Sequence, residues 1–258
     1  FYMKLDNIKN SDTRFLDDQK TNDVDISIDS EQMDMVVSLL TTNLYSNKEA
    51  SLVREIMSNA WDAHVVAQND NPILLSFDED PSGNISLSIR DFGTGLDESE
   101  MDRVYKKLGT STKTNDNNQI GGFGIGKFSA LAYSETVEIF SYHNGTKYAY
   151  RMFKEGLKIK LPLLYKEETD EPNGLQIRVP IKSGDLHSFI VGIREQLPYF
   201  ENLIISNETR NSSLAQLTKE FNSLSIKDFG DFKMNNLSAN SGSCVFGEPK
   251  ILLGKVLY

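Results

Sequence analysis

The chain has 258 residues, which is enough for one large globular domain and part of a second. Its formal net charge of −10 argues against a surface that binds nucleic acid mainly by electrostatics, because such surfaces cluster lysine and arginine. The single cysteine, Cys244, excludes an intrachain disulfide framework and a cysteine-based metal site. It suits a reducing cytosol. With no apolar run near the roughly 18 residues of a membrane span, we expect a soluble, cytoplasmic protein.

The composition changes along the chain and predicts three parts. Residues 1–29 are polar and acidic, and we expect them to form an irregular or strand-like N-terminal arm. Residues 30–206 carry the helical and strand patterns of the principal domain. Residues 207–258 begin with a Ser- and Asn-rich linker and end in one apolar strand at 250–258. This last part reads as the start of a second domain.

Two helices are predicted at the beginning of the principal domain. Apolar residues from Met33 to Leu44 recur at helical spacing and predict a first helix near 31–44. Ser46 and Glu49 have the spacing of a capping box, with serine at the N-cap. A second helix should therefore start there and run to about Ala67.

Strands dominate the rest of the domain. Alternating apolar residues predict a hairpin of Ile73–Phe77 and Ile85–Ile89. The further predicted elements are a helix from Asp97 to about Leu108, strands Thr136–Tyr142, Lys147–Phe153, Leu157–Tyr165 and Leu175–Ile181, and a helix from about Asp185 to Leu197. Phe189, Ile190, Ile193 and Leu197 should face inward from that last helix.

Three polar groups share one face of the second helix. Glu55, Asn59 and Asp62 stand at positions i, i+4 and i+7, so they project from the same side. The ordinary explanation is a solvated helix face. The small Ala60 and Ala63 beside them favour instead the close approach of another group. We also expect His64 to be an interior helix residue with a hydrogen-bonded ring.

A second stretch, from Asp91 to Leu96, ends the predicted hairpin. Asp91 at the end of a strand, followed by Gly93 and Gly95, places a carboxylate where the chain turns away with little bulk. Taken alone, this stretch is better explained as an ordinary Asp-x-Gly turn.

The third stretch is a glycine cluster that follows a polar loop at 109–118, which has the length usual for lids. Gly121, Gly122, Gly124 and Gly126 precede Lys127 and an apolar helical run. Such a loop can hold phosphates through its backbone N–H groups and the following helix N-terminus. It nearly fits a P-loop, but Phe128 occupies the position of the magnesium-binding Ser or Thr, which disfavours that assignment.

The three stretches, in this order, resemble the N, G1 and G2 boxes of the GHKL ATPases over about residues 30–181. The resemblance implies an α+β Bergerat fold, a two-layer sandwich with a mixed β-sheet and helices on one face, and ATP held between helices and lid. The runs Thr42–Lys48, Asp62–His64 and Ile120–Gly126 are similar to the bacteriophage rapid-lysis A (rIIA) family. That likeness implies a cytoplasmic role in infected bacteria, in lysis timing or protection against exclusion. It also implies a homodimer on nucleotide binding, and a phage or host protein as partner.

The GHKL resemblance implies a role for each matching residue. Glu55 would be the general base that orients water, Asn59 the side chain on Mg²⁺, and Asp91 the acceptor for the adenine amine. The implied nucleotide-binding set is completed on the base and ribose side by Asp62, Ala63, Gly93, Gly95 and Leu96, and around the phosphates by Lys113, Gly121, Gly122, Phe123, Gly124, Ile125, Gly126 and Lys127.

Two departures from the GHKL pattern are visible. Gly174-Leu175 stands where many members carry Gly-Thr, so a polar contact to the adenine-binding Asp is missing or supplied otherwise. Neither Lys250 nor Lys255 can be assigned as the lysine from a following domain that reaches the γ-phosphate in many members. We therefore expect slow hydrolysis by this chain.

Other functions fit parts of the pattern. One is a nucleotide-sensing interaction module with little hydrolysis. Another is a DNA-associated ATPase of the topoisomerase or MutL kind, which should show DNA-stimulated turnover with steep salt dependence. A structural domain without nucleotide is the remaining alternative. No histidine stands in a helical phosphoacceptor setting before the ATPase unit, which argues against a histidine kinase.

Overall fold

The computed structural model describes residues 47–106, 128–156, 158–200 and 202–228, and the short segments 233–235, 252–253 and 256–257. In these residues the helices are α2 (Lys48–Ala67), α3 (Glu98–Lys106), α4 (Ala130–Tyr133), α5 (Leu186–Gln196) and α6 (Ser212–Asn222). The strands of the main sheet are β1 (Ile73–Glu79), β2 (Ile85–Arg90), β3 (Thr136–His143), β4 (Thr146–Glu155), β5 (Lys158–Lys160), β6 (Leu163–Glu168), β7 (Gly174–Pro180) and β8 (Leu203–Asn207).

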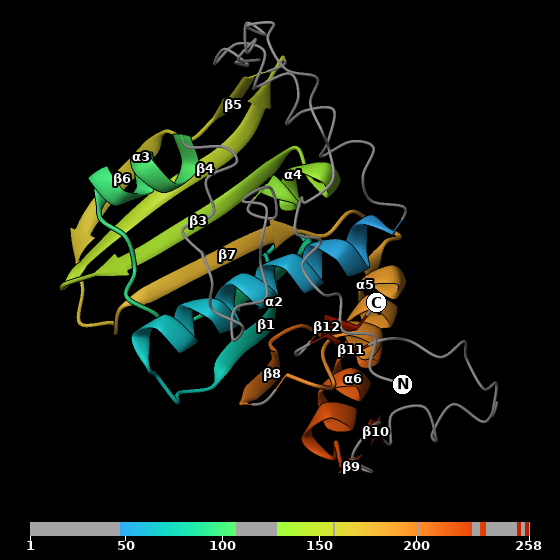
Figure 1. The fold of residues 1–258 in the computed structure, drawn as a ribbon. Coiled ribbons are helices and arrows are strands. Elements are labelled where there is room, and N and C mark those ends of the chain that lie inside the picture. The colour runs from blue at the N-terminus through green and yellow to red at the C-terminus, as the bar shows by residue number, and fades with distance from the viewer. Residues whose placement is uncertain are drawn as a thin grey trace, which may run out of the picture.

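The fold is α+β, with an open, mixed sheet of eight strands, and it confirms the predicted fold class. The strand order is β5-β4-β3-β7-β2-β1-β8, with β6 also paired to β4. Among the described strands, β1 and β8 pair in parallel and the other pairs are antiparallel. Figure 1 shows α2 lying across one face of the sheet, with α5 beside it. The sheet forms one layer, and α2 and α5 form the second layer on its face.

Helix α2 is the element that the rest of the site depends on. Its buried side, which includes Leu52, Val53, Ile56, Met57 and Ala60, faces the core. The helix ends at Ala67, as predicted. The predicted N-cap at Ser46 is wrong by one residue: the Asn47 side chain accepts the N–H of Ala50 at 3.0 Å, because an asparagine oxygen caps as well as a serine hydroxyl.

Helix α5 packs tightly on α2. A Cβ at Gly192 would lie 2.9 Å from the Cα of Ala50, so glycine is required for this approach. The four residues predicted to face inward from α5 are all buried. Leu214 and Leu217 of α6 join the same core, and Arg194 pairs with Glu220 at 2.8 Å. The domain boundary at residue 207 stays a prediction.

Two predicted strands differ in the structure. The single strand predicted at Leu157–Tyr165 is divided into β5 and β6, because Pro162 has no N–H to donate to a sheet. The C-terminal apolar run contains two short antiparallel strands, β11 (Leu252–Leu253) and β12 (Val256–Leu257), rather than one. Helix α6 and the small pair of β9 (Ile226–Asp228) with β10 (Lys233–Asn235) lie in the predicted linker.

The N-terminal arm, the predicted helix at 31–44 and the predicted lid at 109–118 fall outside the described residues. Within the described part of the chain, no helix is both long enough and apolar enough to cross a membrane.

Candidate functional site

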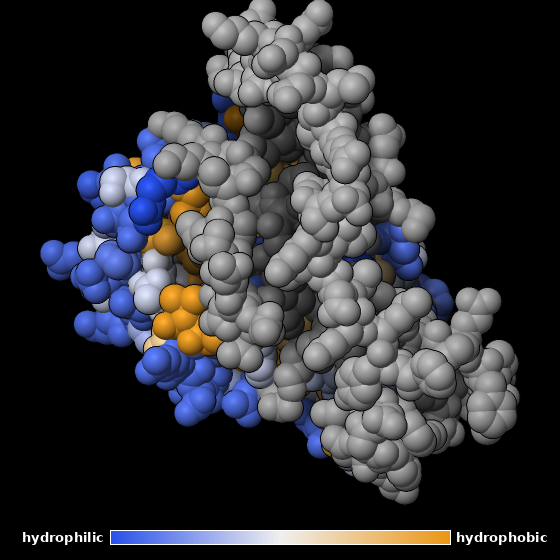
Figure 2. Space-filling model, viewed as in Figure 1, coloured by the Kyte–Doolittle hydropathy of each residue, from blue (hydrophilic) through white to orange (hydrophobic). Residues whose placement is uncertain are grey.

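The polar face of α2 is only partly exposed. Asn59 is exposed, and the side chain of Glu55 is 25% exposed and forms an ion pair with Arg54 at 3.2 Å. Asp62, in contrast, is 2% exposed. A purely solvated face would leave all three side chains in water, so the burial of Asp62 argues against that explanation. Figure 2 shows hydrophobic surface between α3 and α2 on this side of the molecule.

Asp91 follows the last residue of β2 and is buried. Its Oδ1 accepts two backbone hydrogen bonds, from the N–H of Gly93 at 2.9 Å and the N–H of Leu175 at 3.0 Å. Burial raises the pKa of Asp91 to about 6, while these two hydrogen bonds and the nearby Arg90 oppose the rise. Among the hydrogen bonds between described residues, none reaches Oδ2. This oxygen can therefore accept a hydrogen bond from a ligand.

The backbone of Leu175 makes a polar contact with Asp91, at the position where the sequence analysis could not assign one. Its N–H donates to Asp91, and its carbonyl accepts the N–H of Asp91 at 2.8 Å. Gly174 makes this approach possible: its φ is +140°, and a Cβ there would overlap the Asp91 carbonyl. The Asp91 carboxylate thus has a main-chain partner at this position although leucine offers no side-chain hydroxyl.

Residues 91–97, which connect β2 to α3, form the Asp91 loop. Each of its two glycines is required for a different structural reason. A Cβ on Gly93 would lie 2.8 Å from the Cβ of Ala63, so the loop rests directly on α2, as the small residues of α2 suggested. Gly95 has a φ of +67°, and a Cβ there would overlap the carbonyl of Tyr142. Leu96 follows; its N–H and carbonyl both bond to the hydroxyl of Ser141, at 2.8 and 2.6 Å.

Three residues that the sequence did not assign to the site hold the Asp91 loop. The guanidinium of Arg90 donates to the carbonyl of Asp91 and lies over the Tyr142 ring, 4.0 Å from its centroid. His64 and Asn69 both bond to the Phe92 backbone. His64 was expected as a buried, hydrogen-bonded residue, which is confirmed, but neither spacing nor composition indicates its partner.

The phosphate-side residues Lys113 and Gly121–Lys127 lie outside the described residues, so their placement stays a prediction. The next residue, Phe128, is buried and packs edge-on against Tyr105, with 6.0 Å between the ring centroids. The chain that leaves the glycine cluster is therefore anchored in the core close to α3.

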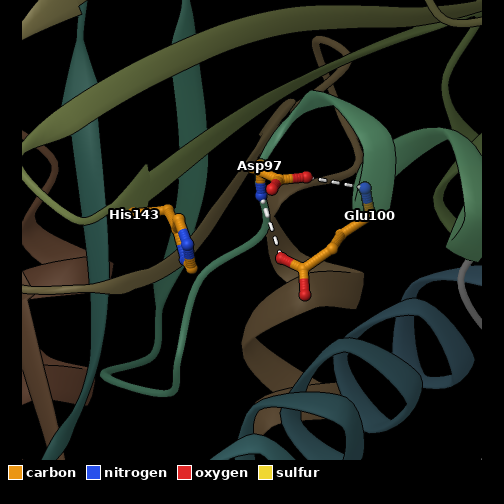
Figure 3. Close-up of side chains that lie close together, drawn as sticks. All are labelled: Asp97, Glu100 and His143. Atoms are coloured by element: carbon orange, nitrogen blue, oxygen red, sulfur yellow. Dashed lines mark hydrogen bonds between the residues drawn. The ribbon is translucent and has the colours of Figure 1, made fainter.

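Asp97, Glu100 and His143 also lie close together (Figure 3). Asp97 Oδ1 accepts the N–H of Glu100 at 2.8 Å, and Glu100 Oε2 accepts the N–H of Asp97 at 3.1 Å. This reciprocal pair is a capping box, and it confirms Asp97 as the predicted cap of α3. The ring of His143 contacts the carbonyl of Thr94 and the side chain of Asn144. These bonds account for the group without a metal.

Comparison with known proteins places the same residues in a family. Residues 45–171 match the model of the histidine kinase-, DNA gyrase B- and HSP90-like ATPases. These residues form an HATPase-like domain of the GHKL superfamily. The match covers Glu55, Asn59, Asp91 and the glycine cluster. This match agrees with the resemblance carried by the three stretches.

Curated relatives of the GHKL domain are chaperones. The chain is 29% identical over 188 residues to chaperone protein HtpG of Aliarcobacter butzleri, covering 61% of this chain and 28% of that protein. It is 29% identical over 252 residues to HtpG of Borreliella burgdorferi, with 80% and 40% coverage. An endoplasmin homolog of Arabidopsis thaliana is 32% identical over 138 residues, with 44% and 16% coverage. The chain thus spans only 28% of the first of these relatives. The narrower likeness to the rIIA family stays a prediction.

Proposed function

We propose that this chain binds ATP with Mg²⁺ between α2 and the Asp91 loop, and that it hydrolyses the γ-phosphate. The observation that carries the proposal is the buried Asp91 carboxylate, which has one oxygen held by two backbone N–H groups and the other open to a donor. A buried carboxylate is costly unless it meets a partner. The family match supports the same nucleotide.

At the base end, Asp91 recognises adenine. Its Oδ2 accepts from the exocyclic amine of adenine, while guanine presents an acceptor at that position and is rejected. Gly93 and Gly95 keep the loop free of side chains, and Asp62, Ala63 and Leu96 complete the wall of the base and ribose pocket. The close approach of Gly93 to Ala63 supports this arrangement, because it brings the loop against α2.

At the phosphate end, α2 supplies the side chains. Asn59 is exposed, one helical turn beyond Glu55, and offers an amide oxygen, which is a ligand type that Mg²⁺ accepts alongside phosphate oxygens and water. Asn59 therefore fits the metal. When bound, Mg²⁺ neutralises charge that develops on the phosphates. Glu55 takes the proton of the attacking water, and Lys113 and Gly121–Lys127 surround the phosphates.

A calorimetric titration with a non-hydrolysable ATP analogue and Mg²⁺ tests the proposal. We expect saturable binding with one site per chain, and much weaker binding of the matching GTP analogue, because guanine presents a carbonyl oxygen to Asp91 where adenine presents its amine. Size measurement of the same sample should show dimers with the analogue and fewer without it. Equal binding of both analogues, or of neither, would contradict the proposal.

The ion pair between Glu55 and Arg54 favours a second candidate, a nucleotide sensor that scarcely hydrolyses ATP. A carboxylate held by a neighbouring guanidinium is less available to take a proton from water. Multiple-turnover phosphate release separates the two functions, because a sensor releases phosphate no faster than a variant that lacks the base.

We further propose that the domain serves a phage during infection, in the cytoplasm of the host, with lysis control or resistance to exclusion as its role. The support is the likeness of Thr42–Lys48, Asp62–His64 and Ile120–Gly126 to the rIIA family. The complete gene from which this chain comes should restore plaque formation to an rIIA-deficient phage on a lysogen that excludes it. Failure of expressed protein to do so would remove this setting, while leaving ATP binding untouched.

A further inference from the structure

The backbone N–H and carbonyl of Phe92 are both hydrogen-bonded, one to a side chain of α2 and the other to the residue that follows the C-cap of α2. The N–H of Phe92 donates to Nε2 of His64 at 2.7 Å. The carbonyl of Phe92 accepts from Nδ2 of Asn69, also at 2.7 Å. Because β2 ends at Arg90, no strand pairing is available to these two groups. Side chains at and just beyond the C-terminal end of α2 take the place of strand-to-strand hydrogen bonds.

The backbone of the neighbouring residue, Asp91, is also hydrogen-bonded at both its N–H and its carbonyl. The N–H of Asp91 donates to the carbonyl of Leu175, and the carbonyl of Asp91 accepts from the buried Arg90. Four consecutive backbone groups are therefore bonded, two to the β2–β7 region and two to the end of α2. Such complete bonding fixes the direction in which the Asp91 side chain leaves the backbone.

The side chains of Asn69 and His64 are themselves oriented by their surroundings. The oxygen of Asn69 accepts the N–H of Asn71 at 2.8 Å, which turns its amide nitrogen toward Phe92. His64 is buried, and burial with the nearby Arg90 lowers its pKa, although a hydrogen bond to the Asn71 backbone opposes this. The ring is thus neutral near pH 7, and Nε2 is free of a proton and able to accept.

We propose that His64 and Asn69 are positioning residues, which fix the Asp91 carboxylate relative to the Glu55 and Asn59 face of the same helix and so set the selection of adenine. This inference rests on the proposed ATP binding. Neither residue touches the base in this scheme. They act through the backbone N–H and carbonyl of Phe92, and their loss lets the carboxylate turn away from the amine.

The test compares two nucleotides that differ only at the contact made by Asp91. One is a non-hydrolysable ATP analogue, and the other is the same analogue of purine riboside triphosphate, which lacks the exocyclic amine. For the wild-type chain, the ratio of the two Kd values should be roughly tenfold to a hundredfold, the value of a hydrogen bond to a charged group. If a residue had only a structural role, its substitution would weaken the binding of both analogues equally and leave this ratio unchanged.

His64→Leu removes the acceptor for the Phe92 N–H, and Asn69→Asp removes the donor for its carbonyl while keeping an oxygen for Asn71. Both variants should bring the ratio close to one. His64→Gln, which can still accept through its amide oxygen, should keep most of the ratio. Val66→Ala, on an exposed part of the same helix end, is the matched control and should keep all of it.

Each outcome decides the inference. A cavity of about 150 Å³ lined by His64 and Asn69 gives the substituted side chains room, and thermal melting checks that each variant folds. If His64→Leu does not fold, Asn69→Asp decides. An unchanged ratio, or equal weakening of both analogues, overturns the positioning role while the proposed function stands. A wild-type chain that binds neither analogue overturns both.

Discussion

Replacing Glu55 with alanine should lower the rate of phosphate release roughly 10²- to 10⁴-fold and leave the affinity for ATP within a few-fold of wild type. The reason is that a general base acts on water during the reaction and makes no contact that holds the ground-state nucleotide. Multiple-turnover phosphate release with Mg²⁺ measures the rate, and titration with the non-hydrolysable analogue measures the affinity.

Glu208→Ala is the control for this experiment, since Glu208 is an exposed glutamate that follows the edge strand β8. It should change neither quantity. Turnover that persists in Glu55→Ala would remove Glu55 from its proposed role. If wild type and Glu55→Ala both release phosphate at the background rate while ATP still binds, the sensor function is the correct one.

Asp91→Asn should weaken ATP binding and yet stabilise the unliganded chain at alkaline pH. The asparagine oxygen can still accept from Gly93 and Leu175, but its amide group meets the adenine amine with a donor. Loss of this charged hydrogen bond should raise the Kd for ATP roughly tenfold to a hundredfold. Titration of the variant with the ATP analogue measures this change.

The stability effect follows from the pKa of Asp91, which burial raises to about 6. A raised carboxyl pKa means that the folded state holds its proton more strongly than the unfolded state. Ionised Asp91 therefore lowers the free energy of unfolding as pH rises from about 4 to above 6, by up to about 3 kcal/mol for a two-unit shift. Asp91→Asn removes this loss and should melt several degrees above wild type at pH 8.

The pH dependence distinguishes this cause from others. The advantage of Asp91→Asn should shrink below pH 6 and vanish near pH 4, where the wild-type carboxyl is protonated. Asp80→Asn should show the opposite trend, because hydrogen bonds from Asn84 lower the pKa of Asp80. A variant at position 91 that melts below wild type at pH 8, or with no dependence on pH, would contradict the assignment.

Much of the fold could be predicted because its signals are local. Alternation between apolar and polar residues located the β1–β2 hairpin, and helical spacing located α2 and α5. The division at Pro162 is not visible in this pattern, because apolar residues continue on both sides of the proline and resemble one strand. Helix α6 was missed because its Ser- and Asn-rich sequence resembles a linker, although Leu214 and Leu217 bury completely.

The sequence indicates candidate side chains for the site but not the backbone contacts around them. Glu55, Asn59 and Asp91 could be chosen because their spacing matches a known pattern. The N–H of Leu175 could not, since any residue type carries one, and Leu175 gives no sign that it bonds to Asp91. The contacts of His64 and Asn69 with Phe92 are also hidden, because they join residues 28 and 23 positions apart, respectively.

The close packing of Gly192 in α5 against Ala50 in α2 couples the positions of the two helices. Glu55 and His64 are nine residues apart, so the helix holds them at a fixed separation of roughly 13 Å. Because Gly192 of α5 packs against Ala50 with no room for a methyl group, a displacement of α5 would have to move α2 as well, and Glu55 and His64 would move with it as one rigid segment.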